Sequence, residues 1–261
     1  MKIKDVTSAL ECFAPLPLQE DYDNAGLQVG LTEAEVSGVL LCLDVTEAVL
    51  REAKEKGCNM IVAHHPLIFR RLRRVTGEDY VQRCVMDAVK NDIAIVAMHT
   101  NLDSVRGGVN HMIARKLGLE DVEMLGAREA CGTEAGCGVV GTLPEPLAAK
   151  DFISRVKTTF HAGCVMTNEL LQRPIRRVAL CGGSGAFALQ KAVEAGADAF
   201  LTGEMHYHEY FGTEQEIQIA VTGHYESEQF TINLLEEIIN SRCEGVRTVR
   251  TEVCTNPVMY H

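Results

Sequence analysis

The chain has 261 residues, of which 46% are hydrophobic and 23% charged, and its formal net charge is −11. This length and composition exclude a disordered chain and indicate a globular protein with one large domain or two smaller ones. The only basic cluster comprises Arg70, Arg71, Arg73 and Arg74, which is too short for an extended polyanion-binding surface, so nucleic acid is not expected as the main partner.

The sequence also carries information about compartment. No apolar run reaches the roughly 18 residues of a membrane-spanning helix, and the N-terminal residues lack the continuous apolar core of a signal peptide. The ten cysteines are scattered singly, without a C-x-x-C pair. We therefore expect a cytoplasmic protein with no membrane partner and with reduced cysteines.

Apolar runs alternate with segments of helical period in the first half of the chain. The pattern predicts strands at 39–45, 59–64 and 93–98, and helices at 46–57 and 80–91. Near-continuous apolar strands separated by amphipathic helices are typical of a sheet that helices cover on both faces. The predicted class is α/β.

The same pattern returns in the second half. It predicts strands at 177–183, 197–204 and 217–223, and helices at 187–196 and 228–241. We therefore expect two similar α/β domains with mixed sheets flanked by helices.

Direct superposition of the two halves supports an internal repeat. An offset of 139 residues places 39–65 on 178–204 without a gap, with Cys42 on Cys181. The prolines and turn residues of 141–150 suggest a boundary somewhere in 121–150. The expected domains are residues 1–125, with the segment from about 221 to 261 packing back on them, and residues 126–220.

A second offset, of 125 residues, aligns the last apolar strand of each half. His99 then falls on His224, and Asp103 falls on Glu228. Both halves therefore follow a strand with the pattern H-x-x-x-D/E.

Two adjacent histidines, His64 and His65, follow the strand predicted at 59–64. Adjacent residues of an extended strand point to opposite faces, so both rings can reach one point only where the strand ends. Pro66 supplies that end, because it lacks an N–H donor and restricts the preceding residue. Ligands of open α/β sheets bind beyond the carboxyl ends of the strands, and we expect a site there.

Histidines and carboxylates together predict a metal centre. His224 and Glu228 are four residues apart, which brings both to one face of a helical turn. The candidate metal ligands are His64, His65, Asp103, His224 and Glu228, with His99 and Glu204 as candidate catalytic residues. Imidazole and carboxylate without thiolate fit Zn, Fe, Mn or Co, and the number of ligands favours two ions per subunit with a metal-bridging hydroxide. The expected chemistry is metal-assisted hydrolysis.

Simpler interpretations remain open for several residues. Asp103 can be the N-cap of the following helix at 104–118, and Glu228 can be a first-turn helix acid. The glycine-rich segment 182–185 can cradle a phosphate or form only a tight turn. His111 and His161 are expected to be ordinary histidines rather than ligands.

An ordered set of motifs resembles the NIF-three-like family, the GTP cyclohydrolase I type 2 homologues. The motifs extend over nearly the whole chain: "DYDNAGLQVG" (21–30), "LDVT" (43–46), "AHHPLIF" (63–69), "HTNLDS" and "GGVN" (99–110), "TGE" (202–204) and "GHYESE" (223–228). The resemblance implies two α/β domains related by approximate twofold symmetry, in a compact form without an inserted domain, assembled as a toroidal homohexamer.

The resemblance also implies site residues. The dinuclear metal ligands of the family correspond here to His64, His65, Asp103, His224 and Glu228, and His99 corresponds to a residue that lines the site. The implied function is a metal-dependent hydrolase of a nucleotide or related heterocycle, GTP cyclohydrolase-like by resemblance. The alternatives are a non-enzymatic metal-binding or metal-delivery protein and a regulatory scaffold.

Overall fold

Two mixed β-sheets form the framework of the protein, which we describe from a computed structural model of residues 1–261. Unit 1 comprises Met1–Leu102 and Thr231–Pro257, and unit 2 comprises Asp103–Phe230 and Val258–His261. Each unit holds one sheet flanked by helices, which confirms the predicted α/β class.

The sheet of unit 1 has five strands in the order β1-β4-β3-β2-β13. Strands β2, β3 and β4 are parallel, β13 is parallel to β2, and β1 is antiparallel to β4. All residues of β2, β3 and β4 are buried, as their continuous apolar sequences predicted. The strands are β1 (Gly26–Val29), β2 (Val39–Cys42), β3 (Met60–Ala63), β4 (Ala94–Ala97) and β13 (Thr248–Arg250).

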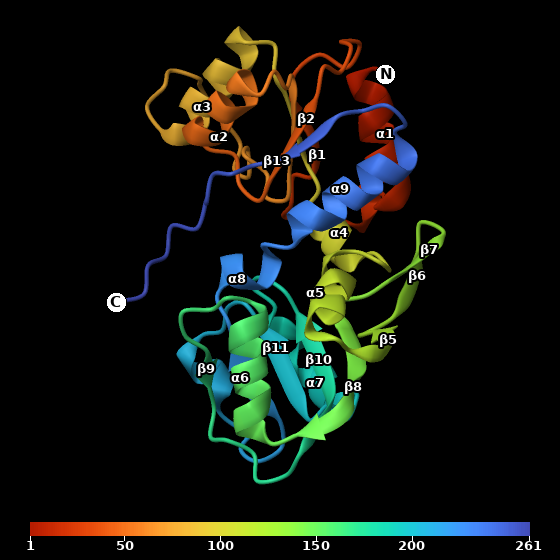
Figure 1. Ribbon diagram of the computed structural model, residues 1–261, viewed down its shortest axis with the longest axis vertical. Helices are drawn as coiled ribbons and strands as arrows, with labels where there is room; N and C mark the ends of the chain where they lie inside the picture. The colour runs from red at the N-terminus through yellow and green to blue at the C-terminus, as the bar shows by residue number, and fades with distance from the viewer. The chain divides into compact units, whose positions relative to one another are not determined.

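Helices cover both faces of this sheet (Figure 1). Helices α2 and α3 pack together on one face, and α1 and α9 on the other. The side chains of Thr46 and Asp79 cap α2 and α3 by accepting hydrogen bonds from the N–H groups of Val49 and Gln82. The helices are α1 (Ile3–Phe13), η1 (Leu16–Leu18), α2 (Glu47–Glu55), α3 (Tyr80–Lys90) and α9 (Thr231–Arg242).

The sheet of unit 2 has six strands in the order β5-β8-β10-β11-β12-β9. Strands β10, β11 and β12 are parallel, whereas β8 and β9 are antiparallel to their neighbours. The strands are β5 (Glu120–Met124), β8 (Val139–Leu147), β9 (Met166–Thr167), β10 (Ile175–Cys181), β11 (Ala199–Thr202) and β12 (Gln218–Val221), and β6 (Arg128–Ala130) and β7 (Thr133–Ala135) form a separate two-stranded sheet.

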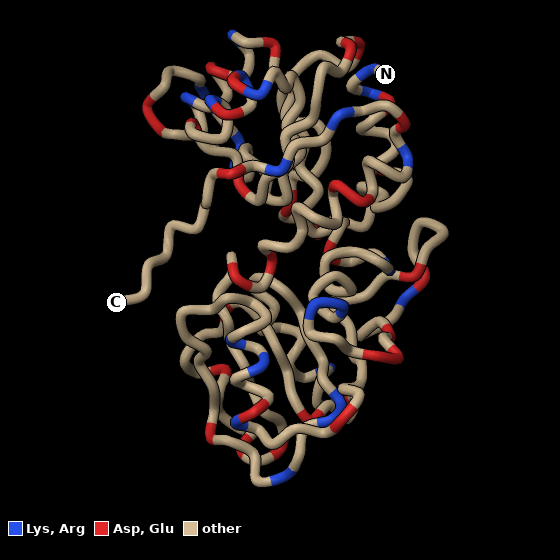
Figure 2. Tube along the Cα trace, viewed as in Figure 1, with Lys and Arg blue, Asp and Glu red and all other residues tan.

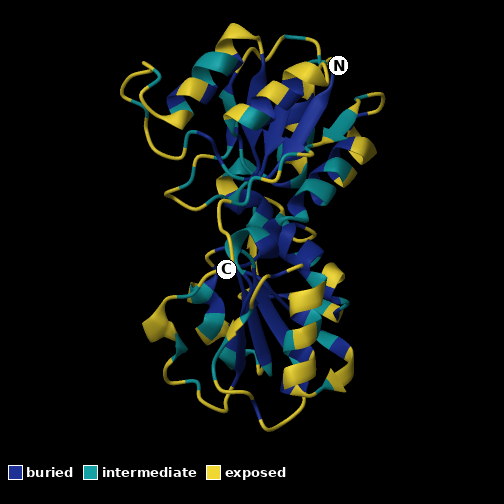
Figure 3. Cartoon of the chain, turned by 60° about the vertical axis from the view of Figure 1, so that its left-hand side comes forward, coloured by how far each residue is buried: buried dark blue, intermediate teal, exposed yellow.

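Helices α5 and α6 contact strands of this second sheet, and α7 contacts β11. The strands lie inside and the helices turn exposed faces outward, which Figure 3 shows for both units. The helices are α5 (Val109–Leu117), α6 (Ala149–Thr159), η2 (Ala186–Ala188), α7 (Leu189–Glu194), η3 (Tyr207–Tyr210) and α8 (His224–Glu228), while α4 (Thr100–Ser104) contains the passage from unit 1 to unit 2.

The strand registers show that the parallel strands of the two sheets correspond. Cys42 pairs with Ala63 in unit 1, and Cys181 pairs with Thr202 in unit 2, so the offset of 139 residues is correct for the first two strands.

The third strand corresponds at an offset of 124 rather than 125. Ala63 pairs with Ala97 and Thr202 with Val221, and helices α4 and α8 also correspond at 124. The predicted match of His99 with His224 is therefore wrong by one residue: His99 precedes its helix, whereas His224 is the first residue of its own. Apolar runs slide past one another easily in a comparison of sequences, whereas hydrogen-bonded register does not.

The compact units differ from the expected domains in three places. Residues 103–125, expected in the first domain, belong to unit 2, where β5 pairs with β8. The proline-containing segment 141–150, expected near a boundary, continues β8 and begins α6. The C-terminal segment returns to unit 1 at Thr231 rather than near 221, and its last residues, Val258–His261, belong to unit 2. Strand pairing over long sequence separations decides these memberships, and local composition does not report it.

Two further expectations concerned reduced cysteines and the absence of a membrane-spanning helix. All ten cysteines are free, and half of them are buried: Cys42, Cys58, Cys84, Cys181 and Cys243. No helix combines the length and the apolar character that crossing a lipid bilayer requires.

Candidate metal centre

Three histidines of unit 1 converge at the carboxyl ends of neighbouring parallel strands. His64 and His65 follow β3, and His99 follows β4. The ring centroid of His64 lies 4.8 Å from that of His65 and 5.3 Å from that of His99. One nitrogen from each ring lies within 4.8 Å of the other two. Residues 35 positions apart in sequence thus present imidazoles to one point.

Backbone pairing explains how two adjacent histidines reach that point. The N–H groups of His64 and His65 donate to the carbonyls of Cys42 and Leu43, at 3.2 and 2.9 Å, so the ladder with β2 continues through both residues. Pro66 has no N–H to extend it, and the strand stops there. His64 is fully buried, and the side chain of His65 is about one-fifth exposed (21%).

Each of the three imidazoles has its Nδ1 beside an acceptor. His64 Nδ1 lies 2.8 Å from the carbonyl oxygen of Met98. His65 Nδ1 lies 2.8 Å from Asp44 Oδ1, and His99 Nδ1 lies 2.7 Å from Asp23 Oδ1. These acceptors favour the tautomer with the proton on Nδ1 and the lone pair on Nε2, which is the arrangement that metal-ligating histidines adopt.

Asp44 orients His65 and was not among the predicted site residues. Its second carboxylate oxygen accepts a hydrogen bond from Thr255 Oγ1 at 2.9 Å. Burial raises the pKa of Asp44, but its hydrogen bonds with His65 and Thr255 outweigh burial, so its pKa lies below the ordinary value. The only signal in the sequence was its place in the motif "LDVT", directly after a buried strand.

Asp23 plays the corresponding part for His99. Its side chain is fully buried, and its Oδ2 accepts hydrogen bonds from the N–H of Thr100, at 3.0 Å, and from the Thr100 hydroxyl. Burial opposes ionisation, but the hydrogen bonds from His99 and Thr100 lower the pKa of Asp23 to about 2. A buried carboxylate that stays ionised at neutral pH therefore supports this imidazole. Its sequence signal was its place in "DYDNAGLQVG".

A second group of donors lies in unit 2. His224 and Glu228 are the first and last residues of α8, and His224 Nε2 lies 3.1 Å from Glu228 Oε2. His224 Nδ1 lies 3.2 Å from Glu204 Oε1, and the second oxygen of Glu204 accepts a hydrogen bond from the Ser184 hydroxyl. Burial raises the pKa of Glu204, but these polar contacts bring it below the ordinary value. Glu204 thus orients His224 as Asp44 orients His65.

Asp103 belongs to the same group as Glu228. Their carboxylate oxygens lie within 4.8 Å of each other. The pKa of the buried Cys181 thiol is raised well above its ordinary value, first by burial and then by nearby charges that include both carboxylates. The Asp103 carbonyl accepts a hydrogen bond from Asn110 Nδ2 at 3.0 Å.

The structure excludes two simpler interpretations of these carboxylates. The N-cap of α5 is Gly108, and Asp103 lies inside α4, so Asp103 does not cap the following helix. Glu228 ends α8, and the next helix begins at Thr231, so Glu228 is not a first-turn acid. Asp103 is instead an acid in the first turn of α4, and neither acid has the position that the simpler interpretation gave it.

The glycine-rich segment 182–185 forms a tight turn rather than a phosphate cradle. The N–H groups of Gly182, Gly183 and Gly185 donate to the side-chain oxygens of Asn110, Ser227 and Thr202, at 2.9, 3.0 and 3.1 Å. Because protein side chains already use these donors, the turn offers none of them to an anion.

Gly203 explains why the second half has no doubled histidine. It corresponds to His64 in the repeat, and a Cβ at this position would lie 2.7 Å from both Gly183 O and Ser227 Oγ. Such distances leave no room for any side chain. The turn at 182–185 therefore occupies the space that a buried imidazole fills in unit 1.

The donor chemistry of both groups fits divalent transition metals. Imidazole nitrogens and carboxylate oxygens, without a thiolate, suit Zn, Fe, Mn or Co. The fold and these donors together define an α/β protein of two units. Each unit places donor groups suited to metal binding beyond the carboxyl ends of its parallel strands: histidines in unit 1, and a histidine with carboxylates in unit 2.

Comparison with known proteins identifies the family. The sequence profile of Duf34/NIF3 (NGG1p interacting factor 3) matches residues 1–257, and the chain belongs to this family. A Lactococcus lactis subsp. lactis protein named GTP cyclohydrolase 1 type 2 homolog is 35% identical over 261 residues, 98% of each chain. A Clostridium acetobutylicum protein of the same name is 35% identical over 230 residues, 87% of this chain and 85% of that protein.

Solved structures agree with this assignment. A crystal structure of a Staphylococcus aureus protein has a TM-score of 0.91 at 27% identity and covers 100% of this chain and 99% of its own. A Bacillus cereus protein related to NIF3 has a TM-score of 0.89 at 24% identity, with the same coverage, and supports the fold alone.

Proposed function

We propose that this protein binds two divalent transition-metal ions and is a metal-dependent hydrolase of a nucleotide or related heterocycle. The observation that carries the proposal is the shared orientation of His64, His65 and His99, whose Nδ1 atoms are all held by acceptors. Three converging imidazoles that are each oriented through Nδ1 are suited to binding an electron-pair acceptor.

The proposed ligands come from both donor groups. Unit 1 supplies His64 and His65, and unit 2 supplies Asp103, His224 and Glu228, in the residue types that the family resemblance assigns to a dinuclear centre. The relatives carry the name GTP cyclohydrolase 1 type 2 homolog, which makes a purine nucleotide the first substrate class to test.

His99 is proposed to move a proton in the reaction. When bound, the metal ions would supply a water molecule of lowered pKa. His99 Nε2 is proposed to accept a proton and return it to the leaving group, with the ionised carboxylate of the buried Asp23 held at Nδ1. Glu204 is proposed as a positioning residue that holds His224 through Nδ1.

The test combines metal analysis with turnover. The protein is loaded separately with Zn, Mn, Fe and Co and is assayed against GTP, related nucleotides and small cyclic amides. We expect about two equivalents of bound metal and turnover of at least one substrate class. In the double variant His65→Ala, Glu228→Ala, both should be lost, with the far-UV circular dichroism spectrum unchanged.

A matched control changes the same residue types at exposed positions outside both donor groups. The double variant His261→Ala, Glu129→Ala should retain metal content and turnover. Turnover that is equal in the His65, Glu228 variant and the wild type contradicts the hydrolase proposal. Rapid transfer of bound metal to an apo acceptor, without turnover of any substrate, favours metal delivery instead.

A further inference from the structure

Two exposed aromatic rings lie beside the histidines of unit 1. The Phe69 ring lies 6.2 Å from the His99 ring, at an interplanar angle of 85°. The Tyr22 ring lies 6.4 Å from the Phe69 ring, at 66°. Tyr22 is 65% exposed and Phe69 46% exposed. Large aromatic rings are usually buried, so two exposed rings, of which Phe69 meets the His99 imidazole edge-on and Tyr22 meets Phe69, offer ring surface to a ligand.

The backbone of Ile68, the residue before Phe69, forms hydrogen bonds with side chains of the segment that carries Tyr22. Asn24 Nδ2 donates to the Ile68 carbonyl at 2.6 Å, and the Ile68 N–H donates to Gln28 Oε1 at 2.9 Å. Both backbone polar groups of Ile68 are therefore satisfied by one neighbouring segment. This anchoring sets the position of Phe69 before any ligand arrives.

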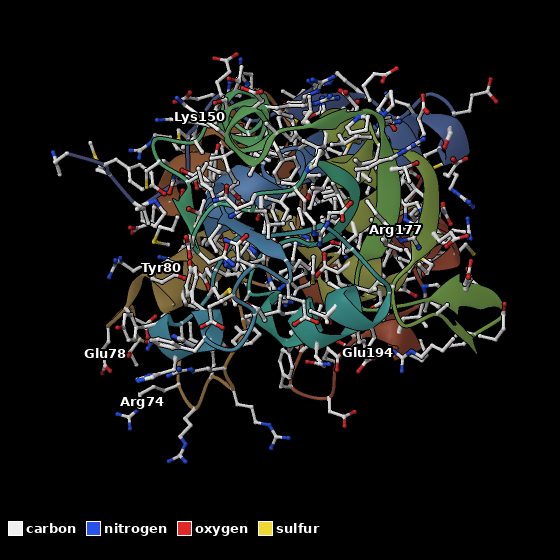
Figure 4. The ribbon with its side chains drawn as sticks, turned by 90° about the horizontal axis from the view of Figure 1, so that it is seen from below. Arg74, Glu78, Tyr80, Lys150, Arg177 and Glu194 are labelled. Carbon is white, nitrogen blue, oxygen red and sulfur yellow. The ribbon has the colours of Figure 1, made fainter.

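The residues after Phe69 form an arginine loop, defined as Arg70, Arg71, Arg73 and Arg74. All four are exposed, and none forms an ion pair. Other arginines of the chain do pair with acids, as Arg83 does with Glu47 at 2.7 Å. Figure 4 shows the side chain of Arg74 directed away from the ribbon. Figure 2 shows acidic and basic residues spread over both units, so four unpaired guanidinium groups in five positions are unusual for this acidic chain.

We propose that Tyr22, Phe69 and the arginine loop bind a planar aromatic compound that carries a phosphate group. The ring stacks on Phe69 beside His99, and the phosphate binds guanidinium groups of the loop, whose planar fork of donors matches phosphate. The inference rests on the proposed function in that it concerns ligand binding at the same site. It gives a binding role to Tyr22 and Phe69, which lie in the motifs at 21–30 and 63–69, and to the arginine loop, which lies outside every quoted motif.

Chain geometry allows one ligand to contact both the Phe69 ring and the arginine loop. The Cα atoms of Phe69 and Arg70 are about 3.8 Å apart, as in any trans peptide. A phosphate attached to a ring on Phe69 is therefore next to the start of the loop. The acidic pair Glu78 and Asp79 soon follows the loop, and the chain carries a net charge of −11, so a small anion suits the loop better than a nucleic acid does.

Calorimetric titration tests the inference through binding rather than turnover. The metal-loaded protein is titrated with the four nucleoside monophosphates AMP, GMP, CMP and UMP and with the four matching nucleosides. We expect each monophosphate to bind about tenfold more tightly than its nucleoside, because its phosphate forms charge-assisted hydrogen bonds with the guanidinium groups. All bases should show the effect, since stacking tolerates any base.

Two variants separate the contribution of phosphate binding from that of ring stacking. The double variant Arg70→Ala, Arg71→Ala should lower monophosphate affinity to that of the nucleoside and leave the nucleoside affinity unchanged. Phe69→Ala should weaken nucleosides and monophosphates equally, by about tenfold, in line with the cost of losing one stacked base. The double variant Arg128→Ala, Arg176→Ala removes the same charge from exposed positions of unit 2 and should behave as the wild type.

Several results would overturn the inference. One is equal affinity for monophosphates and nucleosides, and another is equal loss in the two arginine double variants. A third is a Phe69→Ala protein with unchanged affinity but an altered mass in light scattering, which would place the rings at an interface between copies. Preference for an oligonucleotide over every monophosphate would assign the loop to nucleic acid.

The outcome is separable from that of the proposed function. Monophosphate binding that needs Arg70 and Arg71, in a protein with no turnover, supports this inference and contradicts the hydrolase. Turnover whose KM is unchanged by the arginine and Phe69 variants does the reverse.

Discussion

The partner of each Nδ1 atom distinguishes the histidines of unit 1 from one another. A backbone carbonyl faces His64, whereas carboxylates face His65 and His99. Either acceptor fixes the tautomer and the ring direction, and a carboxylate in addition places a negative charge beside Nδ1. This charge is one reason why proton transfer is proposed for His99 rather than for His64.

Asp23 supplies a prediction about acid stability. Its pKa in the folded protein is about 2, below the ordinary 3.8. A lowered folded-state pKa contributes stability that is present above pH 4 and is lost as the pH falls towards 2. Asp23→Asn should therefore lower the free energy of unfolding by about 2 kcal/mol at pH 7, and by roughly half of that at pH 3. Urea unfolding at both pH values measures it.

Asp21→Asn is the matched control, because Asp21 is exposed and only two positions away. It should change the free energy of unfolding by less than about 0.5 kcal/mol. Equal destabilisation by Asp23→Asn at pH 7 and pH 3 would show that the charge of the carboxylate is not the source of its stabilisation.

At the scale of elements, the two sheets reuse one arrangement of parallel strands with different strand ends. Helices α4 and α8 occupy corresponding places, yet the histidine precedes α4 and begins α8. In unit 1 a buried imidazole follows β3, and in unit 2 the turn at 182–185 fills the corresponding space beside Gly203. A repeat of strands and helices can thus carry donor groups that do not superpose.

Gly203→Ala tests this difference between the halves. The new methyl group would press on the Gly183 carbonyl, which belongs to backbone and cannot rotate away. We expect the free energy of unfolding to fall by about 1–3 kcal/mol, as in other overpacked sites. The measurement is urea unfolding at pH 7, with Ala127→Gly at an exposed position of the same unit as a mild reference. A loss below about 0.5 kcal/mol would mean that the turn can move.

For the whole molecule, the chain changes unit at three places, the last between Pro257 and Val258, and candidate ligands lie beside the first two. The first change falls between Leu102 and Asp103, and the second falls between Phe230 and Thr231, shortly after Glu228. Metal ions bound by these ligands would stabilise the folded protein against unfolding.

Metal binding should therefore appear in the thermal stability. A ligand that binds only the folded state adds about 2.7 kcal/mol when its concentration is one hundred times Kd. We expect the Tm in differential scanning calorimetry to rise with added metal and to fall again with a chelator. His224→Ala should abolish the rise, whereas His161→Ala should not. A Tm that is independent of metal in the wild type would contradict binding to the folded protein.

Much of the fold could be predicted because its strands are buried on both faces. The apolar runs at 39–45, 59–64 and 93–98 became β2, β3 and β4, each trimmed at its ends. The orienting residues Asp23 and Asp44 were missed, because an aspartate in a loop looks the same whether or not its carboxylate meets an imidazole.

The sequence by itself determined the class of fold, the family, and which imidazoles and carboxylates follow the strands. Hydrophobic periodicity and residue type are local properties, and each can be read without knowing the neighbours in space. Only the tertiary structure decided the partner of each Nδ1, the register that separates His99 from His224, and the membership of residues 103–125 in unit 2. Those features depend on hydrogen bonds and strand pairs between distant residues, and no local pattern records which distant partner is chosen.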